Sequence, residues 1–131
     1  MPKFTLEELS AISGKLKFYH LLIDGVSLYD EFCKELERAG NQKGEIYTLL
    51  ARMMEMAELR SMPEKKCKDI TPKGDSTKEY ELKTAHLRLY LIHEKNKGRV
   101  VVLMGKKTNQ KRDIGRFRAI KKDYLKNKEH D

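Results

Sequence analysis

Apolar positions near the start of the chain follow two different spacings. The T-x-x-E pattern at 5–8 is a helix capping box and predicts a short helix that ends near Ile12. The segment 16–23 (LKFYHLLI) is a compact apolar run and predicts a buried strand. Between Ser27 and Gly40, apolar side chains then recur every four residues, which predicts a helix that begins at that serine and ends at that glycine.

A second helix is predicted to follow at once and to form a helical hairpin with the first. Its apolar side chains have the spacing i, i+3, i+4, i+7 and i+11, and Pro63 is expected to end it. A cluster of methionines in this segment fits core filling and core rim better than a soft-metal site. The apolar stripe consists of Ile46, Leu49, Leu50, Met53 and Ala57, and the cluster of Met53, Met54 and Met56.

The second half of the chain predicts three strands and a long helix. Residues 63–78 are polar and contain two prolines, so we expect a connecting loop. Strands are expected near 79–84, 87–94 and 99–104, the last two joined by a tight turn. Residues 100–104 are apolar throughout, as in a central strand that is covered on both faces. The final helix is expected from about 109 to 126, with a buried stripe of Ile114, Phe117, Ile120, Tyr124 and Leu125.

The element order is therefore β-α-α-β-β-β-α with a short leading helix, and the expected fold class is α+β. We expect one domain over 1–131, with a small antiparallel-type sheet, an N-terminal helical hairpin and a C-terminal helix. No apolar run approaches the ~20 residues of a membrane span, and no signal peptide is evident. Cys33 and Cys67 lack a C-x-x-C partner, so a reduced, cytoplasmic chain is expected.

Charge is distributed unevenly between the two halves of the chain. Residues 1–62 carry 8 Lys/Arg against 10 Asp/Glu, whereas residues 63–131 carry 20 against 10. The total is +8, and its concentration in the second half favours an anionic partner for that half. A well-solvated basic surface is the alternative that composition leaves open.

The cations of the second half gather on elements that are expected to adjoin one another. In the strand 87–93, Arg88 shares a face with Tyr90 and Ile92, whereas the leucines point to the other face. A cation that alternates with leucines is expected on a surface, and here it would help to form a trough for a phosphodiester backbone. Between 105 and 122, eight cations stand against the single acid Asp113.

This last third resembles the RelE/HigB superfamily of bacterial and phage toxins. The residues that carry the resemblance are the Tyr-x-Leu-Lys strand ending at Lys83, the Arg88 of the following strand, and the Gly-Lys-Lys step at 105–107 into a basic helix. The resemblance implies the toxin of a type II toxin–antitoxin pair, a ribosome-dependent mRNA endonuclease. It also implies a cognate antitoxin and, as substrate, mRNA held in the decoding (A) site of the ribosome. Cleavage would proceed by attack of a ribose 2′-OH on the adjacent phosphate, without a metal or cofactor.

The resemblance also implies roles for single residues. Lys83 would transfer a proton, because crowding by other cations favours a neutral amine that can act as a base. Arg88 would stabilise the transition state, and Lys107 would protonate or neutralise the leaving group. The RNA-binding positions are Lys106, Lys111, Arg112 and Arg116.

Histidines add a further catalytic candidate. His86 lies in a turn close to Lys83 and Arg88, where it is either a general acid or base or an ordinary exposed histidine. The four histidines lack ligand spacing, so no metal site is expected. Where some members of the superfamily carry a lysine, this chain has Glu81, and His130 is expected to be frayed rather than catalytic. Lys121 and Lys122 are expected on the solvent face of the last helix.

Two functions of another kind compete with the nuclease. The related ParE branch of the superfamily keeps the fold but poisons DNA gyrase, and a basic module could also tether RNA without cutting it. The abundance of cations on the sheet and the helix argues against the gyrase poison. These alternatives stay open at the level of the sequence.

Overall fold

The computed structural model describes residues 2–40 and 42–128. His130, discussed above, lies outside these residues. The described elements are β1 (Phe4–Glu8), β2 (Lys17–Ile23), β3 (Val26–Ser27), α1 (Leu28–Ala39), α2 (Lys43–Ala57), β4 (Cys67–Asp69), β5 (Glu79–Lys83), β6 (Leu87–Glu94), β7 (Gly98–Lys106), a 3₁₀ turn at Lys107–Asn109 and α3 (Gln110–Lys128).

The strands form one sheet in the order β1-β2-β7-β6-β5-β4, with the two-residue β3 paired to β2. All neighbouring strands are antiparallel except β2 and β7, which pair in parallel. A parallel pair requires a long crossover connection, and here that connection contains α1 and α2. The expected α+β fold class is confirmed, but the sheet is mixed rather than purely antiparallel.

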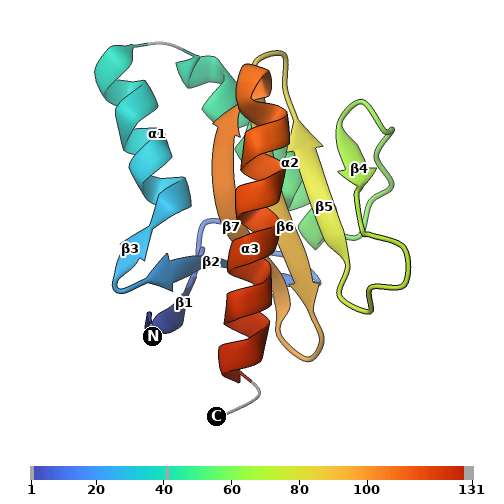
Figure 1. The fold of residues 1–131 in the computed structure, drawn as a ribbon. Helices are drawn as coiled ribbons and strands as arrows, with labels where there is room; N and C mark the ends of the chain where they lie inside the picture. Colours follow the sequence, from blue (N-terminus) through green and yellow to red (C-terminus); the bar gives the residue numbers. More distant parts are fainter. Residues whose placement is uncertain (1, 41, 129–131) are drawn as a thin grey trace.

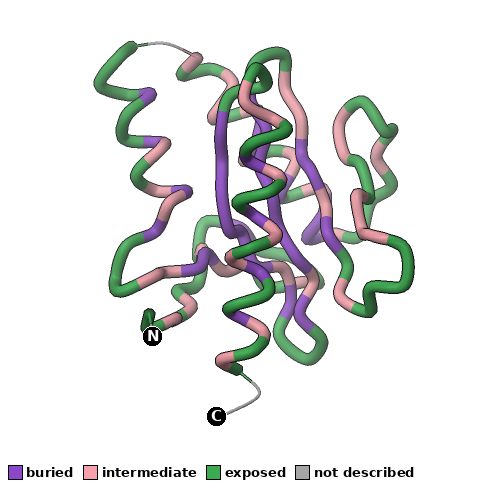
Figure 2. The backbone as a smooth tube through the Cα atoms, in the orientation of Figure 1, coloured by how far each residue is buried: buried purple, intermediate pink, exposed green. Residues whose placement is uncertain are grey.

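Both faces of the sheet are covered. Helices α1 and α2 pack against one face and α3 lies across the other, as Figure 1 shows. The strands β6 and β7 are buried along almost their whole length (Figure 2), which confirms the central strand expected at 100–104. The leucines of β6 point toward α1 and α2, whereas Tyr90 and Ile92 point toward α3 and pack with Phe117.

An irregularity in the pairing of β6 with β7 enlarges the core beneath α3. Tyr90 pairs with Leu103, but the next residue of β6, Leu91, pairs with Val101, so Val102 is an extra residue on β7. Such a bulge places two consecutive side chains on similar sides of a strand. Val102 and Leu103 both belong to the core cluster of the α3 face.

The short leading helix is the main error of the sequence-based prediction. Residues Phe4–Glu8 form an edge strand that pairs with β2, in the register Phe4↔Ile23 to Glu8↔Tyr19. Phe4 and Leu6 are partly buried against the core of the α3 face, so their period of two outweighs the capping-box pattern. The connecting loop at 63–78 likewise contains the short strand β4, which pairs with β5.

The helical hairpin agrees with its prediction except at one end. The Ser27 hydroxyl accepts a hydrogen bond from the Asp30 N–H at 3.0 Å, and Gly40 ends α1 in the left-handed conformation at φ 72°. Helix α2 ends at Ala57, before Pro63. Its methionines behave as expected: two are in the core and Met54 is exposed.

Candidate functional site

The turn between β5 and β6 is fixed by a carboxylate from α2. Glu45 Oε1 accepts a hydrogen bond from the backbone N–H of His86 at 2.7 Å and another from the Thr84 hydroxyl. Glu45 Oε2 lies 2.7 Å from Nδ1 of the His86 ring. One side chain thus holds both the backbone and the imidazole of a turn that lies 41 residues away in the chain.

Three more residues anchor the backbone of this turn through four hydrogen bonds. Arg52 of α2 donates from Nε to the Lys83 carbonyl at 2.7 Å. Arg88 donates from Nη1 to the carbonyls of Thr84 and Leu87, at 2.6 and 2.7 Å. The Lys107 N–H donates to the His86 carbonyl at 2.8 Å, which joins the end of β7 to the turn. The turn is therefore held from α2, β6 and β7 together.

His86 is the side chain that this scaffold presents to solvent. Its side chain is 65% exposed, whereas that of Glu45 is 19% exposed. Because a carboxylate can only accept, the hydrogen-bond network assigns the proton to Nδ1 and leaves the Nε2 lone pair pointing away from Glu45. An oriented imidazole whose Nε2 has no hydrogen-bond partner within residues 2–40 and 42–128 is the arrangement required of a general base.

Burial alone would raise the pKa of Glu45, but the hydrogen bonds from Thr84 and from the backbone and ring of His86 outweigh burial and lower it. A carboxylate whose pKa is lowered by folding stabilises the native state fully above its ordinary pKa of 4.5, and this contribution is lost as the pH falls through the lower native value. We expect the free energy of unfolding to fall more steeply in the wild type than in Glu45→Gln as the pH is lowered from 4.5. Urea denaturation between about pH 3 and 7 measures both slopes; equal slopes would contradict this assignment.

The two sheet cations of the sequence prediction lie in register beside this turn. Lys83 pairs with Arg88, and Arg88 pairs with Gly105 of β7. Lys83 Nζ lies 3.9 Å from Glu81 Oε1, so a carboxylate stands beside the ammonium in addition to the cross-strand Arg88. The predicted catalytic positions 83, 86, 88 and 107 therefore meet at one end of the sheet, but their side chains differ in access.

Arg88 is not on the surface as predicted: it is only 8% exposed. The first turn of α3 covers its face of the sheet, and Asp113 packs directly over Gly105. Arg88 lies there in a buried polar group with Glu81, Tyr90 and Asp113, which the sequence did not predict. The sequence does contain a sign of this buried polar group. Charged residues alternate along β5 at Glu79, Glu81 and Lys83, and three charged residues on one face of a buried strand need partners.

This polar group is incompletely bonded. Gln110 donates from Nε2 to Glu81 Oε2 at 2.6 Å. Arg88 Nε and the Tyr90 hydroxyl are buried without a hydrogen-bond partner among the described residues. Burial, with the negative charges of Glu81 and Asp113, raises the pKa of Tyr90 above its ordinary value, so its phenol stays protonated.

Gly105 allows α3 to approach β7 this closely. A Cβ at this position would lie 2.0 Å from Asp113 Oδ2, far inside van der Waals contact. We expect Gly105→Ala to reduce the free energy of unfolding by about 1–3 kcal/mol through overpacking. Gly115→Ala is the matched control, because a Cβ there meets open space and alanine should stabilise the helix by about 0.5–1 kcal/mol. Chemical denaturation measures both, and equal effects of the two substitutions would refute the close approach.

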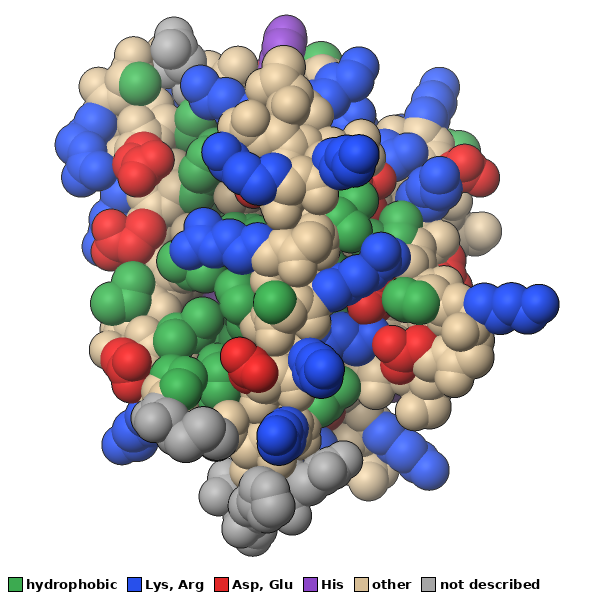
Figure 3. Space-filling model, in the orientation of Figure 1, with side chains coloured by type: hydrophobic (Ala, Val, Ile, Leu, Met, Phe, Trp, Pro, Cys, Tyr) green, Lys and Arg blue, Asp and Glu red, His purple; other side chains and the backbone are tan. Residues whose placement is uncertain are grey.

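The predicted RNA-binding cations are exposed near this end of the sheet. Lys106 ends β7, Lys107 begins the 3₁₀ turn, and both side chains face solvent. Lys111, Arg112 and Arg116 follow as exposed residues of α3. Figure 3 shows Lys and Arg side chains along α3 and at the upper edge of the molecule, where a histidine also stands. The exposed part of the candidate site thus combines His86 with these cations.

Two other cations of α3 have structural partners. Lys121 was expected in solvent, but Nζ is buried and bonds Asp75 Oδ2 at 2.8 Å, Glu79 Oε2 at 2.7 Å and the Thr77 carbonyl at 2.9 Å. Arg118 donates to Glu79 Oε1 at 3.0 Å and to the Ile70 carbonyl at 2.7 Å. These bonds tie the 70–78 segment to α3. Lys122 is exposed as predicted.

Comparison of the chain with protein-family models, curated proteins and solved structures finds no match. Within residues 2–40 and 42–128, no three His, Cys, Asp or Glu side chains are grouped so that they could hold a metal ion. In the same residues no helix has the length and apolar character needed to cross a bilayer.

Proposed function

We propose that this protein is an endoribonuclease, specifically a ribosome-dependent mRNA endonuclease that serves as the toxin of a type II toxin–antitoxin pair in the cytoplasm. The observation that carries the proposal is the exposed His86 imidazole, oriented by Glu45 at 2.7 Å beside the exposed cations of the β7 end. An antitoxin that covers these cations would silence it.

The geometry supports a change in the roles expected from the sequence. Nε2 of His86 accepts the proton of a ribose 2′-OH, whose oxygen attacks the adjacent phosphorus while the 5′-oxygen leaves. Lys107 donates a proton to the 5′-oxygen, which leaves as a hydroxyl as the 2′-oxygen closes a 2′,3′-cyclic phosphate, and Lys106 neutralises the charge that develops on the phosphoryl oxygens. Lys83, beside Glu81, contributes positive charge rather than proton abstraction.

Arg88 takes a different part in this proposal. In the described arrangement its guanidinium bonds the Thr84 and Leu87 carbonyls and lies beneath α3. It therefore orients the turn that carries His86, and it would contact a phosphate only after the first turn of α3 moves. The proposal requires no such movement, because His86 and the exposed lysines are accessible as they stand.

Inducing the protein in bacteria and mapping mRNA 5′ ends tests this function. We expect codon-phased cleavage that is strongly reduced in Lys106→Ala/Lys107→Ala, because each lost phosphate contact weakens RNA binding and charge stabilisation. The matched control is Lys95→Ala, an exposed lysine in the β6–β7 turn at the opposite end of the sheet. Growth arrest with DNA breaks and intact mRNA would favour a gyrase poison instead. Absence of toxicity with retained RNA binding would favour a tethering module.

A further inference from the structure

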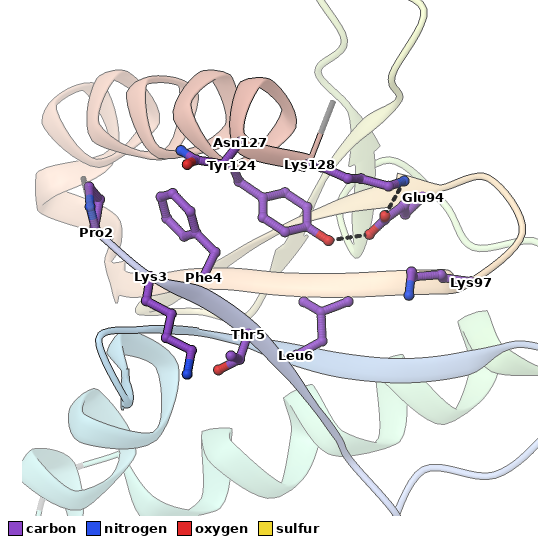
Figure 4. A pocket seen from close by; sticks show the side chains of 10 residues that line it. All are labelled: Pro2, Lys3, Phe4, Thr5, Leu6, Glu94, Lys97, Tyr124, Asn127 and Lys128. Atoms are coloured by element: carbon purple, nitrogen blue, oxygen red, sulfur yellow. Dashed lines mark hydrogen bonds and ion pairs between the residues drawn. The ribbon is translucent and has the colours of Figure 1, made fainter. Parts of the chain in front are cut away.

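A large pocket lies at the end of the sheet opposite His86. It is bounded by β1, by the β6–β7 turn and by the last turns of α3, as Figure 4 shows. Its volume of about 810 Å³ falls within the range of about 300–1,000 Å³ that is usual for small-molecule sites. Glu94 lies six positions after Arg88 along β6, so the pocket is roughly 20 Å from the His86 end.

One wall of the pocket is aromatic and apolar. The rings of Phe4 and Tyr124 meet edge to face, with centroids 5.8 Å apart and an interplanar angle of 77°. Figure 4 shows these two rings pointing toward one another from β1 and α3, with Leu6 beside them. Aromatic and apolar surface of this kind favours a flat ligand that can be buried against it.

A buried carboxylate forms the polar part of the wall. Glu94 is 3% exposed, its Oε2 accepts a hydrogen bond from the Tyr124 hydroxyl at 2.6 Å, and its Oε1 is ion-paired with Lys128. Burial first, and then the hydrogen bond to this carboxylate, raise the pKa of Tyr124, so the phenol remains a donor. An ionised carboxylate has about four acceptor positions, and a ligand reaches Glu94 Oε1 once the half-exposed Lys128 side chain moves aside.

The charges around the pocket restrict the class of ligand. Lys3, Lys97 and Lys128 line it together with Glu94, so a purely cationic ligand would be repelled by the three ammonium groups. A purely anionic ligand would match the lysines but could not supply the N–H donors that the Glu94 carboxylate accepts. A ligand with a flat neutral head that donates N–H groups and with an anionic tail satisfies both requirements. Nucleotides have this chemistry.

We propose that this pocket binds a guanine nucleotide. Guanine presents two adjacent donors, N1–H and N2–H, which match the two oxygens of Glu94, whereas uracil presents a single N–H on that edge. The base lies against Phe4 and Tyr124, and the phosphate meets Lys97 and Lys128, the latter released from Glu94. The proposal rests on the RNA-directed function above, because the guanosine is inferred to belong to the RNA strand that reaches His86.

Titration of the full chain with GMP, followed by NMR of the aromatic signals, tests the pocket. We expect saturable shifts of the Phe4 and Tyr124 signals and binding of GMP about tenfold tighter than UMP, the equivalent of about 1.4 kcal/mol. Glu94→Gln should weaken GMP binding tenfold or more. Lys97→Ala should weaken the binding of GMP but leave that of guanosine unchanged, since only GMP has a phosphate. Lys95→Ala, in the same turn, is the matched control and should change neither.

Several outcomes would contradict the proposed guanine-nucleotide site and leave the proposed nuclease activity unaffected. These are equal affinity for GMP and UMP, indifference to both Glu94→Gln and Lys97→Ala, or no saturable shift up to about 10 mM GMP, a range that detects a Kd near 1 mM. Lys97→Ala and the GMP–UMP comparison keep the test valid if Glu94→Gln fails to fold.

His86→Ala should bind GMP normally, so lost cleavage and lost nucleotide binding are separate results. A uridine oligonucleotide with one guanosine should bind more tightly than free GMP; the reverse would make the free nucleotide the ligand and overturn the RNA assignment.

Discussion

Replacing Lys121 by alanine should reduce the free energy of unfolding by about 3 kcal/mol, the low end of the loss seen when one partner of a buried ion pair is removed. The Lys121 side chain is 5% exposed, and its ammonium satisfies Glu79, which is 1% exposed, as well as Asp75. Without it, the Glu79 carboxylate keeps, among the described residues, only its bond from Arg118, and the 70–78 segment loses its bonds to α3 through Asp75 and Thr77 but keeps the one through Ile70. Chemical denaturation followed by circular dichroism measures the loss.

The neighbouring residue supplies the control for this prediction. Lys122→Ala removes an exposed lysine of the same helix and should change the free energy of unfolding by no more than about 0.5 kcal/mol. Lys121→Met retains the length of the side chain but not its charge, so it should remain destabilising, and adding Glu79→Gln should recover part of the loss. A destabilisation no larger than that of Lys122→Ala would show that the buried ion cluster is not formed in solution.

The sequence predicts the central elements of this fold because their patterns are set by burial. In β6, leucines alternate with Arg88, Tyr90 and Ile92, and both sets of side chains enter a core on their own side of the sheet. The two edge strands are harder to find. β4 is largely exposed and polar, and β1 is only partly buried, so neither contains the apolar run that identifies an inner strand.

The sequence predicted where the candidate site lies on the sheet, but not which contacts its side chains make. Residues 83, 86, 88 and 107 do meet at one end of the sheet because β5, β6 and β7 pair in sequence order. The burial of Arg88 and Lys121 was not predictable from periodicity, since it depends on where α3 crosses the sheet. Glu45 was missed for a related reason: it is one of many acids in the chain, and only tertiary packing brings α2 to the turn at His86.

Replacing His86 should have the largest effect on cleavage if the proposed mechanism holds. His86→Ala should lower the rate of mRNA cleavage on translating ribosomes by about 10²–10⁴-fold, the usual contribution of a positioned acid or base. His86→Gln should lose as much, although its amide can still bond Glu45, because it cannot exchange a proton at neutral pH. Glu45→Ala should lose less, since the imidazole remains but is no longer oriented.

The measurement is single-turnover cleavage of a defined mRNA, with thermal unfolding of each variant as the test of folding. Because the His86 side chain is 65% exposed, its replacement should leave the stability of the fold nearly unchanged. Lys95→Ala, at the far end of the sheet, should cleave at the wild-type rate. If His86→Gln retains wild-type activity while Lys106→Ala/Lys107→Ala does not, proton transfer belongs to another group, and the exposed lysines of the β7 end become the first place to look for it.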